Sequence, residues 1–133
     1  MTQLTMKVTT AKGYDETVEL VRASLGDAGF GVLTEIDIKA TLKTKLDVDV
    51  EPQVILGACR PQLAHAAMQA DPSIAALLPC NVVVRADGDR TVVEAFDPQA
   101  MTALATGAPA DLRDIAADAR ARLLGALETV ESA

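Results

Sequence analysis

The sequence is short of aromatic side chains: its 133 residues include one Tyr, two Phe and no Trp. Proteins that bind single-stranded nucleic acid stack the bases on aromatic rings, and this chain has too few rings for such a platform. Basic residues are also outnumbered, with 12 Lys and Arg against 19 Asp and Glu and a formal charge of −7. We therefore expect no nucleic-acid partner.

Long apolar runs are missing as well. No segment approaches the roughly 20 apolar residues that span a bilayer. The N-terminal segment, Met1–Glu16, lacks the apolar core of a secretory signal. We expect a cytoplasmic protein with no membrane partner, in which the two cysteines, Cys59 and Cys80, are reduced thiols.

The motifs of several common enzyme classes are absent too. Gly29 and Gly31 lack the third glycine of a dinucleotide-binding loop and lie between a helix and a strand, the wrong order for that motif. There is no G-x-S-x-G of a serine hydrolase. There is no C-x-x-C pair, and the single histidine, His65, follows Cys59 by six positions, so we predict no metal site. We expect His65 at the surface or in a dimer contact. Reaction and cofactor stay open.

What the sequence does contain is a clear alternation of strand and helix patterns. It predicts one α+β domain over residues 1–133, with a single, largely antiparallel sheet and helices packed on one side of it. The expected order is strand, helix, strand, short helix, strand, helix, two strands joined by a tight turn, and two final helices. The predicted strands are 4–9, 30–38, 53–59, 81–86 and 90–96, and the predicted final helices are 97–106 and one starting at 109.

The two cysteines are the sharpest chemical feature. Cys59 ends one predicted strand just before a helix, and Cys80 begins the next strand. If these strands are antiparallel neighbours, both sulfurs lie at the same edge of the sheet, and a nearby helix N-terminus favours the reactive thiolate. The alternative is that both are small apolar core residues, because free cysteine is among the most buried residue types.

Two acids, Glu35 and Asp37, share one face of the predicted strand 30–38, because side chains two apart in a strand point the same way. Val32, Thr34 and Ile36 are expected on the other face. A pair of carboxylates suits acid–base chemistry when one is desolvated. Alternatively, Asp37 caps the helix that follows, and Glu35 pairs with a lysine or faces water.

Asn81 follows Cys80 and either satisfies backbone groups of a turn or adds a polar anchor to a pocket. The candidate ligand-binding pocket predicted from the sequence therefore combines Glu35, Asp37, Cys59, Cys80 and Asn81 at one edge of the sheet.

Three phrases of the sequence carry a resemblance. They are GFGVLTEIDIKATLKTKL (29–46), ILGACRPQLAHAAM (55–68) and LLPCNVVV (77–84). Over nearly the whole chain they resemble the domain-of-unknown-function family 302. The resemblance implies a small α+β fold with one sheet covered by helices, and a homodimer, but no known activity. Arg60 departs from the family pattern, in which Asn usually stands between the Cys and the Pro.

Three functions are compatible with these patterns. The first is a non-enzymatic dimeric binding module with a small-molecule or metal pocket. The second is a thiol-dependent enzyme or redox protein that uses Cys59 and Cys80. The third is a protein-interaction domain without a pocket. Thiol titration with and without denaturant, metal content and ligand-dependent melting distinguish them.

Overall fold

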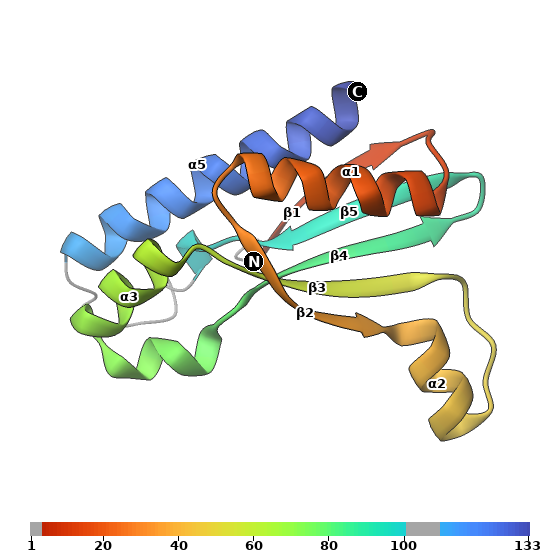
Figure 1. Ribbon diagram of the computed structural model, residues 1–133, viewed down its shortest axis with the longest axis horizontal. Helices are drawn as coiled ribbons and strands as arrows, with labels where there is room; N and C mark the ends of the chain where they lie inside the picture. The colour runs from red at the N-terminus through yellow and green to blue at the C-terminus, as the bar shows by residue number, and fades with distance from the viewer. Residues whose placement is uncertain (1–3, 101–109) are drawn as a thin grey trace.

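The computed structural model describes residues 4–100 and 110–133 (Figure 1). The described elements follow one another as β1 (Thr5–Thr10), α1 (Tyr14–Asp27), β2 (Gly31–Asp37), α2 (Ile38–Leu46), β3 (Gln53–Cys59), α3 (Pro61–Ala70), the 3-10 helix η1 (Pro72–Leu77), β4 (Cys80–Asp87), β5 (Arg90–Phe96) and α5 (Ala110–Ser132). The predicted helix 97–106 lies largely outside the described residues.

The five strands form one sheet in the order β1-β5-β4-β3-β2, and every neighbouring pair is antiparallel. This confirms the predicted single antiparallel sheet. The tight turn between β4 and β5 contains Gly88 at φ 61°, a left-handed conformation that glycine adopts without steric cost. Gln53–Cys59 and Cys80–Asp87 run side by side in opposite directions, as the sequence predicted.

Helices α1 and α5 lie next to each other across one face of the sheet (Figure 1). The side chains of β4 and β5 alternate, so that Val82, Val84 and Val93 point into the layer beneath these helices and are fully buried. Helix α5 contributes Leu123 and Leu127 to the same cluster. Apart from Phe30, the buried side chains of this core are not aromatic, as the scarcity of aromatic residues leads one to expect.

The opposite face of the sheet carries a row of polar groups. Glu94 of β5 accepts a hydrogen bond from Thr5 Oγ1 at 2.6 Å and one from Arg85 Nη1 at 2.8 Å. These hydrogen bonds, together with the positive charge of Arg85, lower the pKa of Glu94 despite its partial burial. Three strands are therefore linked by side chains on this face as well as by their backbones.

The register of β2 changes between Val32 and Thr34. Val32 lies opposite Ala58 and packs against the core, whereas Thr34 lies opposite Gly57. The prediction that Val32 and Thr34 share a face is therefore wrong, because the extra residue, Leu33, breaks the alternation.

Several helix boundaries follow the capping signals in the sequence. Asp37 caps α2 by accepting a hydrogen bond from the backbone N–H of Ala40 at 2.9 Å. Asp71 accepts one from the N–H of Ser73 at 3.0 Å and starts η1. Such side-chain oxygens satisfy backbone donors that have no partner inside the helix.

Candidate functional site

Cys59 and Cys80 come from neighbouring strands. Cys80 lies opposite Ala58, so Cys59 is one residue further along the adjacent strand. Cys80 is buried and Cys59 is partly buried, and both are free thiols. The predicted placement of the two thiols at one end of neighbouring antiparallel strands is therefore found in the structure.

Both cysteines line one cavity of about 30 Å³. Strands β3 and β4 contribute Cys59 and Cys80 to its lining, and α3 and α5 close it with small and branched apolar side chains. The main apolar lining residues are Phe30, Leu63, Ala67, Leu78, Ile115 and Ala119. A cavity of this size holds about one water molecule.

Burial, and secondarily the nearby Cys59, raises the pKa of the Cys80 thiol to about 11. Removing a thiolate from water disfavours its charge, and the second sulfur adds repulsion when both are ionised. At neutral pH Cys80 is therefore a protonated thiol and a poor nucleophile on its own.

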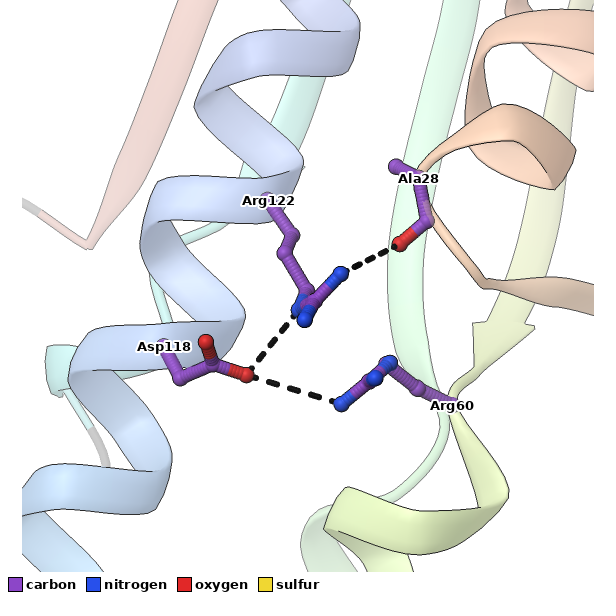
Figure 2. Close-up of polar contacts among 4 residues, drawn as sticks. All are labelled: Ala28, Arg60, Asp118 and Arg122. Carbon is purple, nitrogen blue, oxygen red and sulfur yellow. Dashed lines mark hydrogen bonds and ion pairs between the residues drawn. The ribbon is translucent and has the colours of Figure 1, made fainter.

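Two arginines and one aspartate form a charged cluster that includes Arg60 of the cavity wall (Figure 2). Asp118 Oδ2 on α5 lies 3.6 Å from Arg60 Nη1 and 3.0 Å from Arg122 Nε. Arg122 also donates a hydrogen bond to the carbonyl of Ala28 at 3.4 Å. Arg60 itself lines the cavity, so the cluster joins the start of α3 to α5 and to the end of α1. We call these three charged residues the Arg60 cluster.

Gly29 leaves the space that the Arg60 side chain occupies. Its φ is 91°, which favours glycine, and a Cβ at this position would come within 3.0 Å of Arg60 Nε. Arg60 therefore packs directly over the backbone of the α1–β2 connection. The sequence offered one signal for the cluster, the four-residue spacing of Asp118 and Arg122 on a helix. Their contact with Arg60 is tertiary and has no local signal.

The acids lie elsewhere. Gly31 is opposite Cys59, whereas Asp37, at the other end of β2, is opposite Val54. Glu35 forms an ion pair with Arg22 of α1 at 2.7 Å. The structure thus does not bring the two acids to the thiols. Asp37 caps α2, and Glu35 is paired with an arginine, whereas a lysine was the predicted alternative partner.

Tyr14, at the start of α1, is close to these acids. Burial, followed by the charges of Asp37, Asp15 and Glu35, raises the pKa of the Tyr14 phenol. The phenol and the carboxylates therefore interact electrostatically near the start of α1. It is separated from the cysteines by the length of β2.

Asn81 and His65 are both exposed. Asn81 follows Cys80 in β4 and is opposite Gly57, so strand alternation places its side chain on the other face of the sheet from Cys80. Of the five predicted pocket residues, only Cys59 and Cys80 line the same cavity.

A second and larger hollow lies beside α2. It has a volume of about 560 Å³ and is open to solvent. Ile38 and Leu42 of α2 form one wall, and Pro52, Arg85 and Asp87 belong to the opposite one. We call it the α2 groove. The sequence does not predict this groove, because the apolar stripe of a short helix indicates a buried face and not an open one.

Within the described parts of the chain there is no group of three or more His, Cys, Asp or Glu side chains placed to hold a metal ion. Among the same residues, none of the helices has the length and apolar character needed to cross a membrane.

Comparison with known proteins identifies the family. No curated protein matches the chain. The crystal structure of an uncharacterized conserved protein DUF302 from Bacillus stearothermophilus is similar over 98% of this chain and 100% of its own, with 29% sequence identity and a TM-score of 0.88. The family model described as domain of unknown function DUF302 matches residues 6–130. The chain therefore belongs to the DUF302 family.

Proposed function

We propose that the protein is a non-enzymatic, homodimeric binding module whose two copies associate through a β2–α2 surface. Four large apolar side chains that are exposed to solvent define this surface: Leu33, Ile36, Leu46 and Val48. They are four of the seven exposed large hydrophobic residues in the described part of the chain, and they fall within 16 positions. This concentration is the observation that carries the proposal, because contiguous exposed apolar residues are typical of interaction sites.

Helix α2 also needs a partner for its own stability. It has nine residues, and none of them is buried in the chain that contains it. Helices this short are marginal in water unless tertiary packing supports them. A partner that covers Ile38, Leu42 and Leu46 supplies that packing.

The charges around α2 favour a second copy as that partner. Among the described residues, Lys39 and Lys45 on α2 form no ion pair, and neither do Glu51 and Asp87 at the α2 groove. Both signs are therefore unpaired on one surface. A two-fold axis places each patch against its complement, which is the self-complementarity that homodimer interfaces require.

The α2 groove supports a second candidate function, the binding of a small molecule. Its volume of about 560 Å³ lies in the range of ligand sites, about 300–1,000 Å³, and its walls combine apolar and charged residues. A melting-temperature screen against metabolites tests this candidate, because a ligand that prefers the folded state raises its stability. Leu42→Asp, within the groove, should abolish any shift that such a ligand produces.

The dimer is tested by measuring mass in solution at several protein concentrations. We expect the wild-type protein at twice the mass of one chain and Ile36→Asp as a monomer, because a charge at the interface is desolvated on association. Leu77→Asp is the matched control: Leu77 is 44% exposed and Ile36 46%, but Leu77 lies in η1, away from the surface. A monomeric wild type, or a Leu77→Asp variant that dissociates equally, would refute the proposal.

A further inference from the structure

The outer face of the sheet, which is turned away from α1 and α5, carries an apolar row that continues from the β2–α2 surface (Figure 1). The strand register aligns Ile36 of β2 with Ile55 of β3, and Ile55 with Val83 of β4. Buried residues precede and follow Ile55 and Val83 in their strands, so strand alternation turns both side chains to the outer face. Three branched apolar side chains therefore lie side by side across three strands, on a face that is polar in most antiparallel sheets with one solvated side.

We propose that two copies of the chain stack these outer faces against each other, around a two-fold axis that runs along β3. This inference rests on the homodimer proposed above, and it adds which face the copies share and how they are oriented. With the axis parallel to the strands, β2 of one copy lies over β4 of the other, and each β3 lies over its counterpart. Ile36 then meets Val83 of the second copy, and Ile55 meets Ile55, which is the self-contact that a two-fold axis produces.

The area that a stable dimer needs supports this arrangement. An interface of standard size buries about 800 Å² and about 20–30 residues on each partner. The four exposed apolar side chains that define the β2–α2 surface make up only a small part of such an interface. The outer face is the neighbouring surface that supplies the remainder, because Ile36 belongs to both. Sheets that stack in this way interdigitate their facing side chains at a separation of about 10 Å.

The charges around α2 fit the same axis. Helix α2 follows β2 at the end of the sheet where β4 finishes, because Asp37 and Val84 both pair with Val54. With β2 over β4 of the second copy, α2 therefore lies beside the far end of that strand, which carries Asp87. Among the described residues, Asp87 and two lysines of α2 form no ion pair within the chain. The axis repeats the contact, so that opposite charges meet at two symmetric places.

The test is the mass in solution of chains that carry a charge on the proposed axis. Ile55→Glu and Ile55→Lys should each raise the dissociation constant of the dimer about 30-fold or more, because like charges then face each other. An equimolar mixture of the two variants should form mixed dimers that are tighter than the dimers of either variant alone. Thr9→Glu is the matched control, since Thr9 lies on the outer face in β1, outside the overlap of the two sheets, and it should leave the dimer unchanged. Circular dichroism checks that every variant is folded.

The outcomes separate the stacking of the sheets from the dimer itself. A monomeric wild type refutes both. A dimer that Ile36→Asp dissociates and Ile55→Glu leaves intact keeps the β2–α2 surface as the interface and refutes the stacking of the outer faces. Mixed dimers that are no tighter than those of the single variants, or a Thr9→Glu variant that dissociates equally, also refute the stacking.

A labelling experiment avoids dependence on substitutions at Ile55. Hydroxyl-radical labelling followed by mass spectrometry compares the accessibility of side chains in the wild-type dimer and in the Ile36→Asp monomer. Labelling of Ile55 and Val83 should be lower in the dimer, whereas the exposed Leu77 of η1 should be labelled equally in both proteins. Equal labelling of Ile55 and Val83 in the two proteins overturns the proposal.

Discussion

Gly57 is the position at which the sheet tolerates a side chain least. It lies in β3 directly opposite Thr34 of β2, and a Cβ built there would overlap Thr34 Oγ1 and would lie 2.8 Å from Pro79 Cγ. Thr34 is exposed and its hydroxyl can rotate away, whereas the proline ring is rigid. We therefore expect Gly57→Ala to lower the free energy of unfolding by about 2 kcal/mol, within the usual cost of overpacking.

The assay is urea and thermal unfolding followed by circular dichroism, at fixed protein concentration because association shifts apparent stability. For a chain of this length a loss of about 2 kcal/mol corresponds to a fall in Tm of roughly 6–10 °C. Adding Thr34→Ala removes one of the two clashes and should restore part of the loss, which a double-mutant cycle quantifies.

Gly125→Ala is the matched control. Gly125 lies in α5, and a Cβ there meets no described atom within 4 Å outside its own helix. Alanine is the better helix former, so this variant should be more stable by about 0.5–1 kcal/mol. The reasoning fails if Gly57→Ala unfolds like the wild type, or if Thr34→Ala restores nothing.

Two further predictions concern single side chains. Because the folded-state pKa of Glu94 is lowered, its ion pair and hydrogen bonds add stability above the ordinary Glu pKa, and this stability is lost as the pH falls through the folded-state value. Glu94→Gln should therefore be less stable than wild type by about 0.5–1.5 kcal/mol at pH 7 and by less at pH 3. The control Glu131→Gln, on the exposed end of α5, should match the stability of the wild type at both pH values. Asp37→Ala removes the cap of α2 and should speed amide exchange in 38–46 by weakening that helix by about 1 kcal/mol. Asp37→Asn keeps a capping oxygen and should exchange like the wild type, and equal exchange in all three proteins would exclude the capping role.

Most of the fold could be predicted from local patterns. The three consecutive valines 82–84 indicate a strand, and the aspartates before Pro72 and at position 37 mark helix starts. These features depend on neighbours in the sequence, and the structure confirms them.

The pocket could not be predicted in the same way. The pairing of Glu35 with Arg22 joins a strand to a helix, and the contact of Arg60 with Asp118 joins residues 58 positions apart. Neither contact follows from a residue spacing that can be recognised in the sequence. The acids and thiols looked like one site because they lie near strand ends, but Asp37 and Cys59 belong to opposite ends of the β2–β3 pair.

The register change at Leu33 limits the addition of further strands to the edge of the sheet. β2 is an outer strand of the sheet, and an outer strand with an unbroken hydrogen-bonding rim invites endless addition of further chains. The extra residue interrupts that rim and turns Leu33 outward, where it is 66% exposed. Growth into a fibril along β2 therefore has no continuous ladder to follow, and in the dimer proposed above the copies would meet through side chains.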